Sequence, residues 1–162
     1  MPKLIILRGN SGCGKSSSSC LIREKAKKTA LVEQDYLRRI VLKEREVPDG
    51  DNIDLIYDTV SFALERGYNV VLEGILASKR YKRMLKKLVS NWPEHYVYYF
   101  NVSLEETLRR HVTKPDAHEF GEKEMREWYL EKDTLNLKRE KILSEKLTQD
   151  EVVAEILKDS GL

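Results

Sequence analysis

Short apolar runs alternate with longer amphipathic stretches along this chain. The apolar runs are typical of buried strands, and they cover residues 3–7, 29–34, 68–73, 95–102 and 141–143. Between them, apolar residues recur every three or four positions, which predicts helices over residues 17–28, 36–43, 53–66, 78–90, 104–111, 122–133 and from 149 onward. The alternation predicts an α/β fold with a mainly parallel sheet of about five strands and helices on both faces.

Local signals mark several of the helix ends. Ser103-x-x-Glu106 and Thr148-x-x-Glu151 are capping-box patterns, and Gly67 is typical of a helix C-terminus. The chain has 162 residues, a length that suits one domain with a single core. We therefore expect residues 1–162 to fold as one domain.

The first apolar run leads directly into a glycine-rich segment, which fits the pattern G-x-x-x-x-G-K-[ST] at every specified position. Its glycines permit positive φ and a close backbone approach, so successive N–H groups can surround polyphosphate oxygens. Because a predicted strand precedes it and a predicted helix follows it, we expect a phosphate-binding P-loop of the Walker A type. The expected nucleotide contacts are Gly9, Asn10, Ser11, Gly12, Cys13, Gly14, Lys15, Ser16 and Ser17.

Two side chains of this loop have the chemistry that phosphoryl transfer needs. Lys15 can place its charge between the β- and γ-phosphates of ATP, and the Ser16 hydroxyl can ligate Mg²⁺. The helix that begins near residue 14 aims the positive end of its dipole at the same anion. ATP and Mg²⁺ are therefore the expected cofactors, although the motif does not specify the reaction.

Residues just after each strand are further candidates, because ligands bind beyond the carboxyl ends of such sheets. Asp35 follows the second strand, where a carboxylate can orient an acceptor hydroxyl for attack on the γ-phosphate. Arg38, one helical turn later, can hold an acceptor phosphate or stabilise transition-state charge. Simpler roles stay open: Asp35 is also a good helix N-cap, and Arg38 suits an exposed helix face.

Glu73 ends the third predicted strand, where P-loop proteins often carry an acidic residue that organises Mg²⁺. The run Val70-Val71-Leu72-Glu73 is thus similar to a Walker B segment with Glu in place of the commoner Asp. We expect Glu73 to act in catalysis, on the water shell of the metal or on the acceptor. The alternative is a solvent-facing residue at a strand end.

The helical pattern is interrupted after residue 111 and resumes at residue 122. We expect residues 109–133 to form a mobile lid that brings cations onto the nucleotide phosphates and excludes water. Arg110 and Lys114 are the candidate catalytic cations, and Arg109 is a further candidate contact to the nucleotide. A solvated, charged helix end is the alternative. The lid aromatics can stack on a base or pack the lid on the body; they are Phe120, Trp128 and Tyr129.

Charge and composition limit the partners. No apolar run approaches the ~20 residues of a membrane span, and the N-terminus lacks a signal-peptide pattern, so we expect a cytoplasmic protein without a membrane partner. The net charge of +2 does not by itself predict nucleic-acid binding. The predicted helix over residues 78–90, however, is strongly basic, which can guide a polyanion or simply form the wet face of an amphipathic helix.

Taken together, these residues give the chain a family resemblance. It resembles the small P-loop kinases that group polynucleotide 5′-kinases, chloramphenicol phosphotransferase-like and zeta-toxin-like enzymes, specifically over residues 9–16 and more loosely at Asp35-x-x-Arg38. The resemblance implies that Asp35 is a general base and that Arg38 contacts the acceptor phosphate or the transition state. It also implies a pair of lid cations on the phosphates, matched here by Arg110 and Lys114.

We therefore expect an ATP- and Mg²⁺-dependent transferase, a kinase that moves the γ-phosphoryl to a hydroxyl of a small molecule such as a nucleoside, sugar or antibiotic. A nucleic-acid 5′-hydroxyl is the alternative acceptor, and the basic helix favours it. An ATP-hydrolysing switch, with Glu73 polarising water, is a third reading. A regulatory GTPase is disfavoured because no N-K-x-D motif occurs. Neither the acceptor nor the oligomeric state is specified by the sequence.

Overall fold

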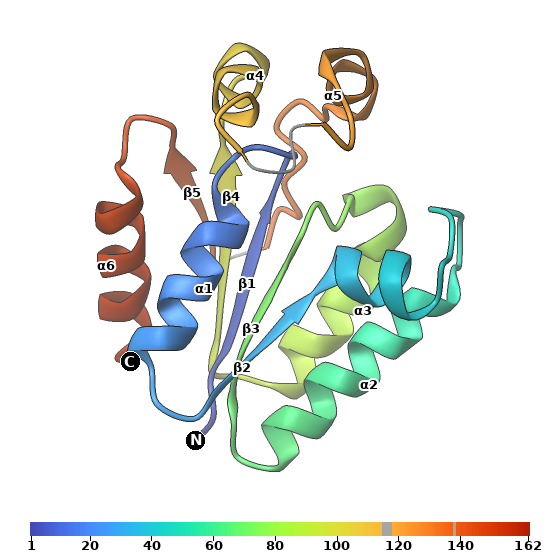
Figure 1. Ribbon diagram of the computed structural model, residues 1–162. Coiled ribbons are helices and arrows are strands. Elements are labelled where there is room, and N and C mark those ends of the chain that lie inside the picture. The colour runs from blue at the N-terminus through green and yellow to red at the C-terminus, as the bar shows by residue number, and fades with distance from the viewer. Residues whose placement is uncertain (115–117, 138) are drawn as a thin grey trace.

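Five parallel strands form the centre of the structure, a computed structural model that describes residues 1–114, 118–137 and 139–162. Their order in the sheet is β2-β3-β1-β4-β5, and each adjacent pair is parallel (Figure 1). The predicted α/β fold is thus confirmed. The strands are β1 (Leu4–Gly9), β2 (Thr29–Glu33), β3 (Asn69–Gly74), β4 (His95–Asn101) and β5 (Glu140–Ser144).

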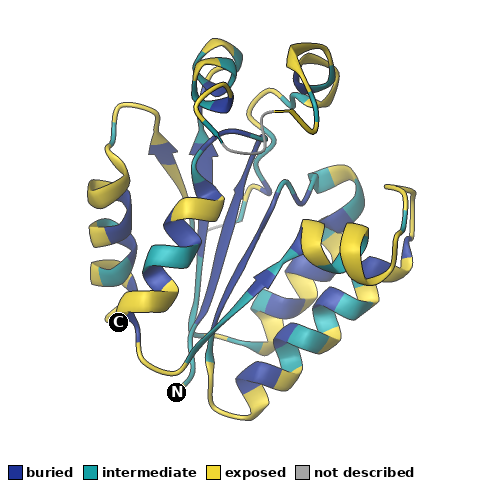
Figure 2. Ribbon diagram, in the orientation of Figure 1, coloured by how far each residue is buried: buried dark blue, intermediate teal, exposed yellow. Residues whose placement is uncertain are grey.

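Helices cover both faces of this sheet. α1 (Lys15–Lys25) and α6 (Gln149–Ser160) lie on one face, and α2 (Asp51–Glu65) and α3 (Ser78–Asn91) lie on the other (Figure 1). Alternate residues of β1 divide between the two core layers. Leu4 and Ile6 pack with α2 and α3, whereas Ile5 and Leu7 pack with α1 and α6. All four are fully buried, as a central parallel strand covered on both faces requires (Figure 2).

The carboxyl ends of the strands carry three further elements. η1 (Tyr36–Val41) follows β2, and α4 (Leu104–His111) and α5 (Glu122–Trp128) lie beyond the end of the sheet, at the top of Figure 1. This is the end at which open α/β sheets bind ligands. The middle of the predicted lid, residues 115–117, lies outside the described residues.

The predicted elements agree with the structure to within about three residues at most ends, with two differences in kind. η1 is a π-helix, whereas the sequence pattern predicts an ordinary helix. The helix predicted over residues 122–133 is wrong in length, since α5 ends at Trp128. The reason is that Tyr129 is extended and that Asp133 is bonded to Arg8 and Ser78.

The two predicted capping patterns are both used, in different ways. The Thr148 hydroxyl accepts from the Glu151 N–H at 3.2 Å, and the Glu151 carboxylate accepts from the Thr148 N–H at 2.7 Å, so this box is reciprocal. The Ser103 hydroxyl accepts from the Glu106 N–H at 3.3 Å. The Glu106 carboxylate turns instead to arginines of its own helix, so Ser103 caps α4 without it.

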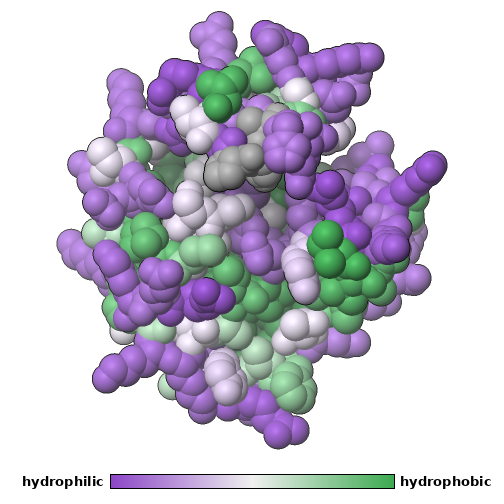
Figure 3. Space-filling view, in the orientation of Figure 1, coloured by the Kyte–Doolittle hydropathy of each residue, from purple (hydrophilic) through white to green (hydrophobic). Residues whose placement is uncertain are grey.

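Polar side chains cover much of the face that Figure 3 shows. In Figure 3 hydrophilic groups surround both ends of the molecule, and a hydrophobic group stands out where η1 lies. Ile40 and Val41 of η1 are 63% and 52% exposed. In the parts of the chain that are described, no helix has the length and apolar character that crossing a membrane requires.

Candidate active site

The glycine-rich loop joins β1 to α1 at the carboxyl end of the sheet. Gly12 and Gly14 have left-handed φ values of 80° and 97°, which a side chain would strain. A Cβ atom on Gly12 would lie 2.8 Å from the carbonyl oxygen of Thr107, so α4 approaches the loop closely. The loop therefore has the left-handed turns from which phosphate-binding nests are built.

The first residues of α1 connect this loop to β3. Lys15 is only 7% exposed, and its Nζ donates to the carbonyl oxygen of Asn10 at 3.1 Å. Ser16 Oγ donates to Glu73 Oε1 at 3.2 Å. α1 has no acidic residue in its first turn, so the positive end of its dipole faces the loop without a compensating carboxylate of its own.

Glu73 is a buried carboxylate next to the loop. It lies opposite Leu7 in the register of β3 with β1, and it is 5% exposed. Burial raises its pKa, and the nearby Lys15 offsets part of that effect. Among the described residues, Glu73 Oε2 has no hydrogen-bond partner. An unpartnered carboxylate oxygen beside a serine hydroxyl fits the oxygen ligands that Mg²⁺ and its bound water require.

Asp35 and Arg38 lie together at the start of η1. Arg38 Nη2 donates to Asp35 Oδ1 at 3.1 Å, and Arg38 Nη1 donates to the carbonyl oxygen of Glu44 at 3.1 Å. The Asp35 carboxyl is 61% exposed, whereas the Arg38 side chain is 14% exposed. The arginine is therefore fixed by two partners, and it holds Asp35 at the edge of the site.

Arg39 is a cation of this site that the sequence analysis missed. It lines the same small cavity as Lys15, Asp35 and Glu73. It lies four positions after Asp35, and residues four apart lie on the same side of a helix. The sequence Asp-Tyr-Leu-Arg-Arg places two arginines three and four positions after Asp35, and this spacing is the signal that could have identified Arg39.

The three predicted lid cations take different positions. Arg110 Nη1 donates to the carbonyl oxygen of Cys13 at 3.0 Å, so this side chain touches the glycine-rich loop directly. Lys114 lines a cavity together with Lys15. Arg109 is exposed and donates to both carboxylate oxygens of Glu106. These bonds from Arg109 and Arg110 lower the pKa of Glu106 to about 2.

Residues of the glycine-rich loop line three cavities in the described structure. The small cavity, of about 120 Å³, is lined by Lys15, Ser16, Asp35, Arg39, Glu73 and Lys114 among others. The α6 cavity, of about 390 Å³, lies between the loop, the end of α4 and the segment before α6, and its lining includes Cys13, Ser17 and Arg110. The large cavity, of about 550 Å³, lies between η1, the start of α3 and α5.

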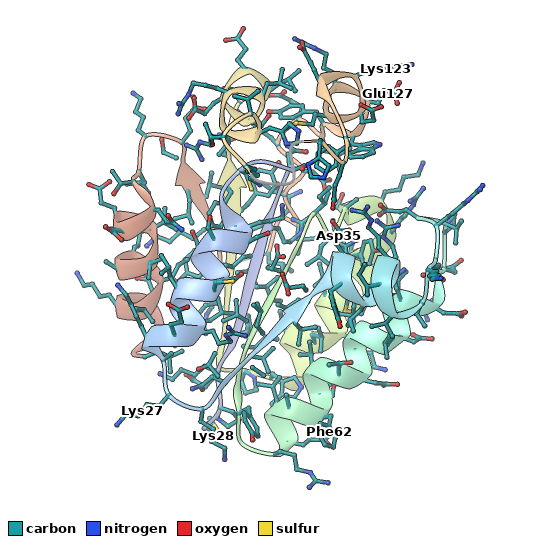
Figure 4. The ribbon with its side chains drawn as sticks, viewed as in Figure 1. Lys27, Lys28, Asp35, Phe62, Lys123 and Glu127 are labelled. Atoms are coloured by element: carbon teal, nitrogen blue, oxygen red, sulfur yellow. The ribbon has the colours of Figure 1, made fainter. Side chains whose placement is uncertain are left out.

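The small cavity adjoins both of the others. It shares Gly12 and Lys114 with the α6 cavity, and its shared lining with the large cavity includes Ser11, Asp35 and Arg39. In Figure 4, Asp35 lies at η1 and Glu127 lies on α5, and both line the large cavity. The predicted site residues Ser11, Lys15, Ser16, Asp35, Glu73 and Lys114 are therefore brought to one small space, whereas Arg109 lines none of these three cavities in the described structure.

The aromatic residues between α4 and β5 pack mainly on one another. The Phe120 ring stacks on His111 with centroids 4.7 Å apart, and Trp128 lies 5.1 Å from Phe120 in a tilted arrangement. Tyr129 donates to the carbonyl oxygen of Val102 at 2.9 Å and so joins this segment to the body. Phe120 and Trp128 also line the large cavity, where they supply an aromatic surface.

A buried charge network behind the large cavity was not predicted from the sequence. Arg8 is fully buried at the end of β1, where it pairs with Asp133 at 3.0 Å and Glu140 at 3.3 Å and donates twice to the Leu76 carbonyl oxygen. Burial lowers the pKa of Arg8, and the two carboxylates oppose that effect. Asp133 also accepts from the Ser78 N–H at 2.8 Å, so the network reaches the start of α3. The sequence did contain one signal of this network, because Arg8 directly follows the apolar residues of a buried strand and a buried charge needs a partner.

Asn10 makes a second connection from the loop to the same wall. Its Nδ2 donates to the carbonyl oxygen of Leu130 at 2.8 Å, and its Oδ1 accepts from the Leu130 N–H at 2.8 Å. Asn10 is 5% exposed. The amide therefore mimics a strand pairing, which fixes the backbone of Leu130 against the glycine-rich loop.

The sequence comparisons find no match: no protein-family model fits the chain, and no curated protein matches it. Solved structures do match it. The APS kinase CysC of Mycobacterium tuberculosis, in complex with AMPPNP and APS, has a TM-score of 0.72 at 17% identity, over 97% of this chain and 96% of that one. A gluconokinase from Sinorhizobium meliloti has a TM-score of 0.66 at 18% identity, over 99% and 92% of the two chains.

A chain of the Pnkp1/Rnl/Hen1 RNA repair complex is also similar. Its TM-score is 0.57 at 20% identity, and the match covers 78% of this chain and 42% of that one. The shared feature of these proteins is the parallel sheet with helices on both faces that is described above. The chain therefore has the α/β fold of P-loop kinases.

Proposed function

We propose that this protein is an ATP- and Mg²⁺-dependent kinase that transfers the γ-phosphoryl group to a hydroxyl of a small molecule. The observation that carries the proposal is the position of the small cavity, between the α6 cavity and the large cavity, with Asp35 at the junction. A nucleotide hydrolase needs space for water beside its phosphates, whereas a kinase needs space for an acceptor. About 550 Å³ is the size of a small-molecule site.

In this proposal, the chain's own residues bind and orient both substrates. Lys15 and the N–H groups of the loop bind the β- and γ-phosphates of ATP, and Arg110 and Lys114 add positive charge from the α4 side. Asp35 accepts the proton of the acceptor hydroxyl while the hydroxyl oxygen forms a bond to the γ-phosphorus. The bond from that phosphorus to the bridging oxygen breaks, and ADP leaves. Arg38 is the residue that holds Asp35 in place.

The metal role is assigned to Ser16 and Glu73. Bound Mg²⁺ supplies charge neutralisation on the phosphate oxygens. Ser16 Oγ and the unpartnered Glu73 Oε2 are the groups that would hold it, directly or through its water. Arg39 reaches the same space and is proposed as an additional cation for the transferred phosphoryl group.

The segment from residue 109 to residue 133 is proposed as the lid. Arg110 already contacts the glycine-rich loop, and Phe120 and Trp128 line the large cavity from the same segment. Arg109 is bonded to Glu106 on the exposed side of α4, so it would reach a nucleotide phosphate only after a rearrangement of this helix. Its role therefore depends on lid movement more than that of Arg110 does.

A polynucleotide 5′-hydroxyl is the second acceptor that a specific observation favours. Lys79 and Arg80, from the basic helix α3, line the large cavity. The RNA repair complex is among the similar structures, and the resemblance of the motifs to polynucleotide kinases points the same way. A strand that entered the large cavity would continue along basic side chains of α3.

The test is transfer of label from γ-labelled ATP with Mg²⁺ to two acceptor panels. One contains 5′-hydroxyl oligonucleotides, and the other contains nucleosides, sugars, sugar acids and hydroxyl-bearing antibiotics. We expect the second panel to be labelled. Asp35→Asn should retain ATP affinity and lose about 10²–10⁴-fold in transfer rate. The matched control is Asp54→Asn, which removes an exposed carboxylate of α2 that lines none of the three cavities and should transfer at the wild-type rate.

The other outcomes are informative in distinct ways. Equal transfer by Asp35→Asn and wild type would remove Asp35 from the mechanism. Labelled oligonucleotide alone would select the second acceptor. Phosphate release without labelling of either panel would overturn the kinase proposal in favour of an ATP-hydrolysing switch, and sensitivity to Glu73→Gln would identify the residue that polarises water.

A further inference from the structure

One wall of the large cavity is lined by cations from two elements. Arg38 and Arg39 come from η1, and Lys79 and Arg80 come from the first turn of α3. Arg38 pairs with Asp35 at 3.1 Å, and Arg80 approaches Glu46 at 3.6 Å. Among the described residues, Arg39 and Lys79 form no ion pair. The wall therefore keeps positive charge that the protein itself does not neutralise.

The start of α3 adds to this potential. The helix has fourteen residues and no acidic residue in its first turn, so its positive end is not compensated by its own side chains. Asp133 accepts from the Ser78 N–H, but Arg8 pairs with the same carboxylate oxygen at 3.0 Å from behind the wall. The charge of Asp133 is thus balanced by a buried arginine.

The remaining carboxylate of the lining comes from a different element. Glu127 lies on α5, away from η1 and the start of α3 (Figure 4). The lining thus has four cations and four carboxylates. Asp35, Glu46 and Asp133 are each paired with an arginine, so among the described residues the charges of the lining that form no ion pair are Arg39 and Lys79 on the wall and Glu127 on α5.

The cations also differ in their distance from the phosphate site. Arg39 lines both the small and the large cavity, whereas Lys79 and Arg80 line only the large one. An anionic group bound at Lys79 and Arg80 would lie away from the γ-phosphate, so that the repulsion between the two substrates is reduced. The same molecule could extend past Phe120 and Trp128 toward Asp35.

We infer that the large cavity binds a small acceptor with an anionic group, a phosphate, sulfate or carboxylate, whose ligands are Lys79 and Arg80, with Arg39 closer to the reacting phosphoryl group. The position of the hydroxyl at Asp35 rests on the proposed kinase function. The anion site itself does not, because it depends only on the cations of the wall and can be tested without turnover.

The experiment uses Trp128 as a reporter, since its side chain lines the large cavity. The protein is loaded with Mg²⁺ and AMPPNP to fill the phosphate-binding loop, and inorganic phosphate is titrated at constant ionic strength. We expect a saturable change in tryptophan fluorescence that Trp128→Phe abolishes. Lys79→Gln and Arg80→Gln should each raise Kd about tenfold, as loss of a charge-assisted hydrogen bond predicts.

Matched controls come from the same helix. Lys82→Gln and Arg83→Gln remove charges of α3 that do not line the cavity, and they should leave Kd within about twofold of wild type, the size of a long-range screened effect. The inference is overturned if the wild type shows no saturable change, or if the double variant Lys79→Gln/Arg80→Gln binds phosphate as the wild type does.

A transfer assay with matched acceptors separates this inference from the proposed function. The pairs are glucose with gluconate and uridine with uridine 3′-monophosphate. Transfer with a preference for the neutral members, unaffected by Arg80→Gln, would overturn the anion site and leave the kinase intact. Saturable phosphate binding without transfer to any hydroxyl compound would sustain the anion site and overturn the kinase. Displacement of phosphate by oligonucleotides but not by uridine 3′-monophosphate would overturn the small-molecule form of the inference.

Discussion

Replacement of Arg8 by methionine tests the buried charge network most directly. The guanidinium is fully buried, donates to the Leu76 carbonyl oxygen at 2.9 and 3.2 Å, and pairs with Asp133 and Glu140 at 3.0 and 3.3 Å. Methionine fills much of the same volume but donates no hydrogen bond. The variant would therefore leave two carboxylates and a buried carbonyl oxygen without their partner.

The expected loss follows from these contacts. Removal of one partner from a buried ion pair costs about 3–5 kcal/mol, because an uncompensated charge remains inside the protein. Leu76 adds to the expected loss of stability. It is fully buried in a strained left-handed conformation with φ of 44°, and the hydrogen bonds from Arg8 to its carbonyl oxygen help to maintain that conformation. For a chain of this size, such a loss lowers Tm by roughly 6–20 °C, at about 2–4 °C per kcal/mol.

The assay is urea denaturation followed by far-UV circular dichroism, with Lys141→Met as the matched control. Lys141 also has two carboxylate partners, Glu155 at 2.6 Å and Asp159 at 3.0 Å, but its side chain is 46% exposed. An exposed pair contributes about 1 kcal/mol or less. If Arg8→Met lost no more free energy of unfolding than Lys141→Met, burial of Arg8 would not make its ion pairs more important for stability than the exposed pairs of Lys141.

Two further predictions concern the glycine-rich loop and its neighbours. Burial raises the pKa of Glu73, so its ionised form lowers the free energy of unfolding once the pH exceeds the ordinary value of 4.5. Glu73→Gln should therefore stabilise the protein at pH 7, by about 1.4 kcal/mol for each pH unit by which the pKa is raised, and should make little difference at pH 4. The variant should also bind Mg²⁺ and ATP more weakly. Equal urea midpoints of the variant and the wild type at pH 7 would contradict the stability prediction. Asn10→Leu removes both hydrogen bonds to the Leu130 backbone. Hydrogen exchange of the Leu130 amide should therefore accelerate, and the free energy of unfolding should fall by about 1–3 kcal/mol. Unchanged exchange at Leu130, measured by mass spectrometry, would contradict this prediction.

Features that depend on local periodicity were predictable from the sequence. The alternation in β1 separates Leu4 and Ile6 from Ile5 and Leu7, and the structure places the two pairs in different core layers. The P-loop motif lies between a strand and a helix as expected, because its pattern and its context are both local. The convergence of Asp35 and Glu73 on the loop followed from the rule that ligands bind at the carboxyl ends of parallel strands.

Features that depend on distant partners were not predictable in the same way. Arg8 pairs with residues that are 125 and 132 positions away, and no window of sequence contains both sides of these contacts. The early end of α5 has the same cause, since Asp133 is held by Arg8 and Ser78 instead of continuing a helix. Arg39, by contrast, reaches the small cavity through its spacing of four residues from Asp35, which is local and was open to prediction.

These long-range contacts also determine which parts of the proposed lid can move. Its C-terminal end is fixed from the interior, because Asn10 holds the Leu130 backbone and Arg8 holds Asp133. Its N-terminal end is bonded to the loop through the partly exposed Arg110, whose guanidinium would bond to a phosphate oxygen more strongly than it does to the Cys13 carbonyl oxygen. A lid that closes on ATP should therefore pivot near residues 130–133 and break contacts on the α4 side. Because Arg8 and Asn10 hold the wall of the large cavity and the next residues of the loop line the small one, the proposed nucleotide and acceptor sites are built on one continuous segment of the chain.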